Sequence, residues 1–412
     1  MKRPIKTKLM KSALLTITTI LLLTIDCFPQ CNEDSLITMP TVNFMAPDSL
    51  IAEIDSTITI QIMDIPDSVY IKRLSALPFE FKMTYNPIVK KFIELYTIRL
   101  KDKLQIIIGL GDFYFPIIDE ILRSSNLPKE LKYLPIIESA LNPQAVSRAH
   151  AVGLWQFMRG TGKENGLLIS NYVDQRRGLI ESTIAASKYL KLLYHMYNDW
   201  QLTLAAYNCG PGNVNKAIRR AGGKRDFWEI YRYLPRETRG YVPAFIGAAY
   251  ALNYYKEHNI GPIPTTLPLQ TDTIFIYKNL HLGQVAGILG LPIDYLKSIN
   301  PQYLKDVIPA SGKIRYSLRV PSEYKPKFIS WKDSIYAYRS SFYKNSNNCV
   351  HAIVSDGKGK VIHHVQSGES LWLIAGQYKV TVNSIKEWNN ISGNKIRQGQ
   401  KLIVYVAGHK VL

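Results

Sequence analysis

The sequence predicts a multidomain protein with one all-α domain followed by two small α+β modules. Three observations lead to this prediction. The chain has 412 residues, more than one ordinary hydrophobic core holds. Hydrophobic residues recur with helical periodicity over residues 86–258. Beyond a proline-rich linker at 259–273, one pattern of hydrophobic residues occurs twice at a constant spacing.

The composition is that of a globular protein with a large basic excess. Hydrophobic residues make up 46% of the chain and charged residues 20%. Lys and Arg number 51 against 32 Asp and Glu, so the net charge is 51 − 32 = +19. This excess indicates polyanionic surroundings, which are nucleic acid, an acidic membrane or an acidic cell wall; a solvated lysine-rich surface is the alternative that explains it equally well. The sequence has no zinc-finger spacing, RNA-binding aromatic signature or basic heptad helix, so no nucleic-acid partner is predicted.

The N-terminus predicts export, with a signal peptide over residues 1–30. Five basic side chains and no acid precede an uncharged, largely apolar run at 12–25: Lys2, Arg3, Lys6, Lys8 and Lys11. That run is too short to cross a bilayer comfortably. Cys27 or Cys31 offers a lipid-bearing first residue as an alternative, although Asp26 and Gln30 suit a lipobox poorly. Soluble or surface-associated export is therefore preferred to a lipoprotein.

The four cysteines form neither a metal-binding spacing nor a dense disulfide framework: Cys27, Cys31, Cys209 and Cys349. A Cys209–Cys349 bridge remains open, and isolated small hydrophobic residues are the preferred interpretation. No metal and no cofactor is predicted.

Residues 31–85 alternate β-branched runs with prolines and acids, which predicts an N-terminal spacer with one strand at 56–62. In the all-α domain, the periodicity predicts a long helix around 184–194 and shorter helices at 201–208, 214–221 and 238–255. Gly210 and Gly212 separate the middle two, and their expected role is to permit positive φ angles in the turn.

The repeat aligns nine positions without a gap. Leu282 corresponds to Leu371 and Asn300 to Asn389, and both 371 − 282 and 389 − 300 equal 89. Each copy reads as two short helices closed by a strand, at 318–321 and at 402–405. The predicted modules are 274–322 and 361–406, with a linker at 323–360. A chance alignment of hydrophobic residues is the alternative.

Glu138 stands alone among apolar neighbours, near the point where a helix must stop. Leu131, Leu134 and Ile137 form one buried stripe after Pro128, which suits a first helical position. Pro143 disfavours a helical residue before it, so Glu138 is expected in or near the last turn. Burial and the negative end of the helix dipole both raise a carboxyl pKa. At a pKa of about 6, roughly one such group in ten is protonated at neutral pH. A solvated glutamate at a helix end is the alternative.

Four motifs follow Glu138 along the chain, at 142–147, 151–158, 206–212 and 237–243. In this order they resemble the lytic transglycosylases of the soluble-transglycosylase, goose-lysozyme-like superfamily, and most closely the membrane-bound lytic murein transglycosylase D family. The resemblance implies an all-α lysozyme-like (SLT) catalytic domain at 86–258. It also implies non-hydrolytic cleavage of the β-1,4 bond between N-acetylmuramic acid and N-acetylglucosamine, leaving a 1,6-anhydro ring.

The resemblance also implies the roles of individual residues. Glu138 is the catalytic acid, and Ser147 lies beside the substrate's N-acetyl group. Gln156 lines the cleft, and Tyr207 and Asn208 contact the sugars. Tyr241 lies near Glu138.

One acid is expected to perform both proton transfers, because the nucleophile is the substrate's own C6 hydroxyl. Asp174 and Glu181 are the other carboxylates considered as neighbours of Glu138 in the fold. Trp155 is expected in the core. For Tyr207, the alternative to a sugar contact is that its ring is simply packed at a helix end. His150 stands where the family commonly has glycine, and Cys209 where it usually has alanine.

Residues 361–406 resemble a LysM domain, a βααβ fold that binds glycans containing N-acetylglucosamine. Ser370 and Thr381 suit the caps of its two helices. The copy at 274–322 lacks the Gly-Glu-Ser-Leu-Trp opening and reads as a degenerate LysM-like module. The resemblance implies a set of glycan-binding residues in the last module: Gly368, Glu369, Ser370, Leu371, Trp388 and Asn389.

The predicted protein is a monomeric, exported lytic transglycosylase of the periplasm or cell envelope that acts on peptidoglycan glycan strands. Its expected contact with a membrane, including the outer membrane, is a lipid anchor or surface association. A hydrolytic muramidase and a non-catalytic peptidoglycan-binding protein are the alternatives.

Overall fold

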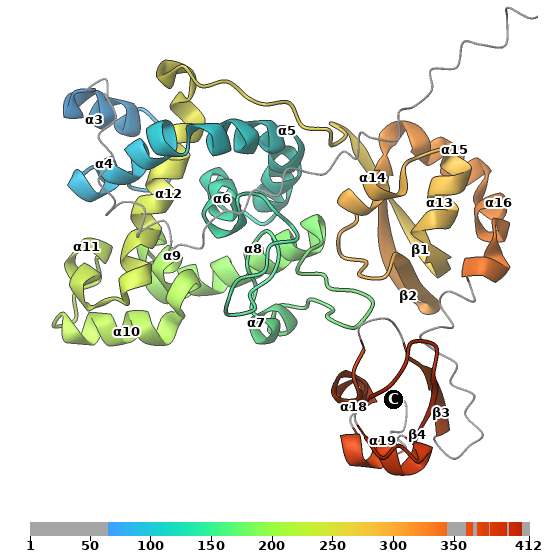
Figure 1. Ribbon diagram of the computed structural model, residues 1–412. Helices are drawn as coiled ribbons and strands as arrows, with labels where there is room; N and C mark the ends of the chain where they lie inside the picture. The colour runs from blue at the N-terminus through green and yellow to red at the C-terminus, as the bar shows by residue number, and fades with distance from the viewer. Residues whose placement is uncertain (1–64, 344–359, 366–368, 379, 394, 406–412) are drawn as a thin grey trace, which may run out of the picture. The chain divides into compact units, whose positions relative to one another are not determined.

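The computed structural model describes residues 65–343, 360–365, 369–378, 380–393 and 395–405 (Figure 1). The predicted signal peptide, the strand at 56–62, Cys27, Cys31, Cys349 and Gly368 lie outside these ranges. Within them, the structure contains no helix with the length and apolarity needed to cross a bilayer.

The first part of the chain is helical, as predicted. Over residues 65–258, all of them described, extended backbone is limited to isolated bridges. The elements follow one another as α3 (Asp67–Ser75), α4 (Pro87–Glu94), the π-helix η1 (Leu95–Arg99), α5 (Lys101–Ser124), the 3₁₀ helix η2 (Lys129–Tyr133), α6 (Leu134–Ser139), α7 (Arg159–Glu164), α8 (Leu179–Tyr197), α9 (Trp200–Cys209), α10 (Pro211–Arg220), α11 (Phe227–Ile230), η3 (Tyr231–Tyr233), α12 (Arg236–Tyr254) and η4 (Lys256–His258).

Helix α12 is the centre of this domain, where it packs against α4, α6 and α9 (Figure 1). Its alanines, glycines and aromatic residues are buried over nearly all of its length, including Tyr241 and Phe245 at 0% exposure. Gly247 allows the close approach of α4, because a Cβ there would lie 2.9 Å from the Phe92 carbonyl carbon. A helix that is apolar on every side is buried on every side, so α12 is the scaffold on which the other helices assemble.

Residues 67–85 are not the spacer that the sequence predicts. Tyr70 and Leu74 of α3 are buried, and the Arg73 guanidinium donates to the Tyr250 hydroxyl at 2.7 Å. The backbone N–H groups of Glu80 and Phe81 donate to the Glu130 carboxylate at 2.6 and 3.0 Å. The composition suggested a spacer because one short helix carries little periodicity, but its side chains join the helical core.

The two α+β modules predicted from the repeat are present. One contains β1 (Thr271–His281), α13 (Leu282–Leu289), α14 (Ile293–Ser298) and β2 (Val307–Pro321), and the other contains β3 (Lys360–His364), α18 (Leu371–Tyr378), α19 (Val382–Asn389) and β4 (Lys401–Tyr405). In each, the two strands pair antiparallel. The helices start at the predicted spacing, since 371 − 282 and 382 − 293 both equal 89.

The last residue of the repeat performs the same task in both modules. The Asn300 side chain accepts from the Arg319 N–H and donates to the Arg319 carbonyl, both at 2.8 Å. Asn389 does the same with Ile403 at 2.6 Å. Each asparagine therefore joins the end of the second helix to the closing strand.

Part of the predicted linker at 323–360 is folded. Three short helices follow β2: η5 (Ser322–Tyr324), α15 (Lys325–Ser330) and α16 (Lys332–Ala337). Phe328 and Ile335 are buried, and the Gln284 amide of α13 donates to the carbonyls of Ile335 and Tyr336 at 3.2 and 3.0 Å. The first α+β module is thus larger than the repeat alone predicts.

Candidate active site

Glu138 lies at the end of a short helix, as predicted. Pro135 occupies the first turn of α6, and Glu138 is its penultimate residue. Ala140 and Leu141 then adopt left-handed conformations with φ of 52° and 62°, which stop the helix before Pro143 is reached. Pro128 precedes the 3₁₀ helix η2 and does not start α6.

The carboxyl group of Glu138 is surrounded by protein, although the residue is only half-buried. Burial raises the pKa of Glu138 to about 7, because the charged form loses its solvation. A hydrogen bond from the Tyr241 hydroxyl to Glu138 Oε1 acts in the opposite direction and lowers this pKa. The result is a carboxyl group that is about half protonated at neutral pH.

Two tyrosines border this carboxyl group. Burial, and then the negative charge of Glu138, raise the pKa of both Tyr207 and Tyr241 well above 10, so both hydroxyls remain neutral donors. The Tyr207 hydroxyl donates to the Trp155 carbonyl at 2.8 Å. Trp155 itself is fully buried and its indole N–H donates to Thr183 at 3.0 Å, which confirms its place in the core.

Asn208 is held by a residue that the sequence did not suggest. The Thr238 hydroxyl, fully buried on α12, donates to the Asn208 Oδ1 at 2.8 Å. Thr238 lies in the motif at 237–243, but nothing in the sequence pairs it with the motif at 206–212. This bond sets the orientation of the Asn208 amide.

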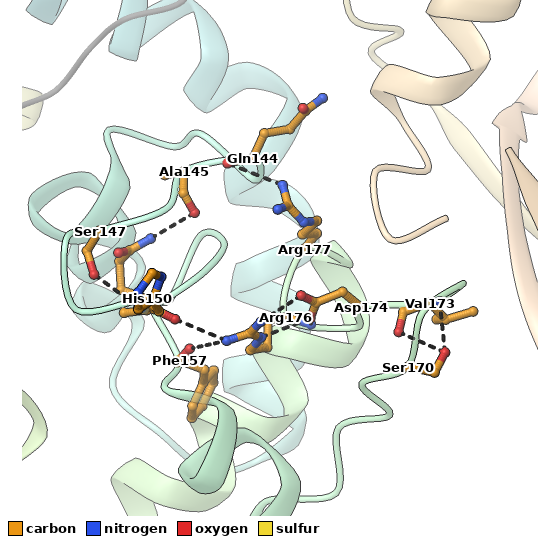
Figure 2. Close-up of polar contacts among 12 residues, drawn as sticks. Gln144, Ala145, Ser147, His150, Phe157, Ser170, Val173, Asp174, Arg176 and Arg177 are labelled. Carbon is orange, nitrogen blue, oxygen red and sulfur yellow. Dashed lines mark hydrogen bonds and ion pairs between the residues drawn. The ribbon is translucent and has the colours of Figure 1, made fainter. Parts of the chain in front are cut away.

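Residues 142–157, called the site loop below, carry Ser147 and Gln156. Figure 2 shows Ser147, His150 and Phe157 of this loop. The Ala151 N–H donates to the Ser147 hydroxyl at 3.0 Å. The Gln156 amide donates to the carbonyls of Gly153 and Ala145 at 2.9 and 3.3 Å, so this side chain holds the loop together. His150 has a φ of 64°, a conformation that glycine adopts most easily.

The two carboxylates considered as neighbours of Glu138 are engaged elsewhere. Asp174 is paired with Arg176 at 2.8 Å. Glu181 accepts a hydrogen bond from the Ser317 hydroxyl at 2.6 Å.

In the last module, two predicted glycan-binding residues have a structural task. Leu371 is buried in the hydrophobic core of the module, and the Asn389 amide is bonded to backbone groups of Ile385 and Ile403. Trp388 is half-buried with its ring edge-on to Tyr405. Ser370 is exposed, and Glu369 pairs with His363 at 2.8 Å. Thr381 caps α19, as predicted.

Comparisons with known proteins divide the chain in the same order. Residues 115–230 match the transglycosylase SLT domain, residues 270–337 the LysM-like domain of lytic transglycosylase MltD, and residues 363–404 the LysM domain. The membrane-bound lytic murein transglycosylase D of Escherichia coli K12 is 32% identical over 291 residues, which are 69% of this chain and 61% of that protein. This chain thus spans about three fifths of that relative's length.

Other relatives match over shorter stretches. The soluble lytic murein transglycosylase of Escherichia coli K12 is 32% identical over 136 residues, 32% of this chain and 20% of that protein. The crystal structure of the 70 kDa soluble lytic transglycosylase SLT70 from Escherichia coli aligns with a TM-score of 0.33 and 24% identity, over 41% of this chain and 28% of that one. Together, these matches confirm the resemblance found in the sequence: the chain contains, in order, a transglycosylase SLT domain, an MltD-type LysM-like domain and a LysM domain, and it is similar to a lytic murein transglycosylase over 69% of its length.

Proposed function

We propose that this chain is a lytic transglycosylase that cleaves the β-1,4 bond between N-acetylmuramic acid and N-acetylglucosamine in peptidoglycan without water. The observation that carries the proposal is Glu138, a single carboxyl group with a pKa of about 7 that accepts a hydrogen bond from Tyr241. General acid–base catalysis is most effective when the pKa of the catalytic group lies near the working pH. The SLT match and the first relative support the same reaction.

The proposed reaction begins with neutral Glu138 donating its proton to the glycosidic oxygen. The bond between that oxygen and C1 of the muramic sugar breaks, and its electron pair leaves with the oxygen. Glu138 is now a carboxylate, the form that the Tyr241 hydrogen bond stabilises. The C6 hydroxyl of the same sugar bonds to C1 and gives its proton to Glu138, which restores the acid and forms the 1,6-anhydro ring.

The substrate contacts implied by the family motifs are part of the proposal. Ser147 lies beside the N-acetyl group, and Tyr207 and Asn208 contact the sugars. Gln156 borders the cleft, where its amide keeps the site loop in shape. The Thr238 bond to Asn208 is consistent with a fixed sugar contact, because an oriented amide recognises a substrate better than a mobile one.

The LysM domain at 363–404 supports glycan binding in addition to cleavage. A tethered binding domain raises the concentration of glycan near the active site, which favours action on an insoluble polymer. We place the protein in the cell envelope after export, as a monomer, with membrane contact through a lipid anchor or surface association. The first relative is named a membrane-bound enzyme, which supports this location.

Mass spectrometry of the soluble products from purified sacculi tests the proposed reaction. The expected muropeptides carry anhydro ends and are lighter by one water than hydrolysis products. Hydrated products with no anhydro sugar would identify a hydrolytic muramidase instead. Equal release by the wild type and the Glu138→Gln variant would leave only a peptidoglycan-binding protein.

A further inference from the structure

We propose that Arg176 is a positioning residue for this reaction: it fixes the site loop, residues 142–157, in the conformation that presents Ser147 and Gln156 to the substrate. The proposal rests on the proposed function for its catalytic consequence, and on the contacts of Arg176 for its structural basis. Arg176 lies between Asp174 and the site loop (Figure 2).

Arg176 and Asp174 form a buried, two-bond ion pair, with exposed fractions of 7% and 5%. Arg176 Nε donates to Asp174 Oδ1 at 2.9 Å, and Nη2 donates to Oδ2 at 2.8 Å. The Arg176 backbone N–H also donates to Oδ1 at 3.1 Å. This paired geometry fixes the plane of the guanidinium group.

The remaining nitrogen of the guanidinium holds the site loop at two points. Arg176 Nη1 donates to the His150 carbonyl at 3.3 Å and to the Phe157 carbonyl at 3.2 Å (Figure 2). These carbonyls flank the segment that contains Gln156, whose φ of 47° is uncommon for a residue with a side chain. The same segment carries the Ala151 N–H that bonds Ser147.

The backbone of Arg176 also touches the loop directly. Gly153 has a φ of 89°, and a Cβ there would lie 1.8 Å from the Arg176 carbonyl oxygen. Only glycine allows this approach. The loop is therefore shaped against Arg176 by both backbone and side chain.

The segment that carries Arg176 is itself fixed from another direction. The Asp174 N–H donates to the Gln302 carbonyl, and the Leu304 N–H donates to the Tyr172 carbonyl, both at 2.9 Å. The Val173 N–H donates to the Ser170 hydroxyl at 3.0 Å (Figure 2). Because this segment is held in place, the Arg176 guanidinium is held in place too, and so are the loop carbonyls that it binds.

Arginine is required for this task, because one ammonium group cannot meet both carboxylate oxygens and both carbonyls in a plane. The Arg176→Lys variant keeps the positive charge beside Asp174 but loses the planar set of N–H donors. The Asp174→Asn/Arg176→Met variant removes both buried charges together, so neither charge is left unpaired in the core. Arg219→Lys, at an exposed position on α10, is the matched control.

Two measurements on the full-length chain test the proposal. Hydrogen–deuterium exchange of residues 145–157 is compared with that of α12, in the wild type and in Arg176→Lys. The kcat/KM for release of muropeptides is measured for Arg176→Lys, for Ser147→Ala and for the two changes combined. We expect faster exchange in the site loop only, and a loss in kcat/KM of about 100-fold, as small displacements of substrate-holding groups produce. The loss from Arg176→Lys and the loss from Ser147→Ala should be less than additive, because both act through one loop.

Unchanged exchange in the loop, undiminished kcat/KM, or fully additive losses would each overturn the positioning role. The Arg219→Lys control should match the wild type in both measurements. A wild-type protein that releases no muropeptide would reject the proposed function, and the exchange measurement would still decide whether Arg176 holds the loop.

Discussion

The hydroxyl of Tyr241 on α12 donates a hydrogen bond to the carboxyl group of Glu138 on α6, across 103 residues of sequence. Burial raises the pKa of Glu138 and this hydrogen bond lowers it, and the resulting pKa is about 7. The bond favours the carboxylate that the second proton transfer requires, while burial favours the acid that the first requires. The two opposing effects allow one side chain to perform both transfers.

Replacing Tyr241 with phenylalanine should raise the pKa of Glu138 further, because the ionised form loses its donor. For the wild type, kcat/KM should fall as the pH rises above about 7, since the reaction starts from protonated Glu138. In Tyr241→Phe this decline should move to higher pH, and kcat should drop. The pH dependence of kcat/KM on soluble glycan strands measures both effects. A decline that stays in place or moves to lower pH contradicts this account, and Tyr277→Phe, exposed on β1, is the control.

Replacing Glu138 with glutamine should stabilise the protein at neutral pH while abolishing activity. The raised pKa means that the folded state binds more protons than the unfolded state between pH 4.5 and about 7, so wild-type stability falls as the pH rises through this window. This difference between the two pKa values corresponds to about 3 kcal/mol in the free energy of unfolding. Urea denaturation should show Glu138→Gln more stable above pH 7 and equal to the wild type near pH 4. The exposed Glu164→Gln is the matched control, and a Glu138→Gln variant no more stable than the wild type at pH 8 would contradict the buried acid.

The two glycines between α9 and α10 should respond differently to alanine. Gly210 has φ and ψ of 82° and 151°, a region that is essentially restricted to glycine, although no atom crowds it. Gly210→Ala should therefore cost about 1–3 kcal/mol through backbone strain alone. Gly212 lies in the first turn of α10 with no positive φ, so Gly212→Ala should be neutral or stabilising by up to about 1 kcal/mol. Chemical denaturation distinguishes the two, and equal effects would contradict the assigned conformations.

Replacing Asn389 with alanine should unfold the LysM domain and leave the helical domain intact. The change removes three hydrogen bonds to the backbone of Ile385 and Ile403, and each buried group left unpaired costs about 1–3 kcal/mol. Asn383→Ala, at an exposed position on the same helix, should have little effect. Limited proteolysis and sacculus pulldown measure the outcome. Retained wall binding by a protease-resistant Asn389→Ala variant would show that the asparagine is dispensable.

The sequence predicted those features that depend on local patterns. The helix end at Glu138 followed from an apolar stripe and Pro143, and the two α+β modules followed from the 89-residue repeat. The sequence did not predict that Arg176 reaches His150 and Phe157, or that Thr238 orients Asn208, because such contacts join segments whose proximity no periodicity encodes. It also did not predict that Leu371 packs in the core of the last module or that Asn389 holds β4.

The titration of Glu138 in the folded protein tests the central claim most directly. Carbon NMR of the labelled side-chain carboxyl, assigned by comparison with Glu138→Gln, reports its protonation at each pH. We predict a midpoint at about 7, raised by burial, and a higher midpoint in Tyr241→Phe. A midpoint near 4.5, the ordinary value for glutamate, would contradict the proposal that this side chain carries a proton to the substrate at neutral pH.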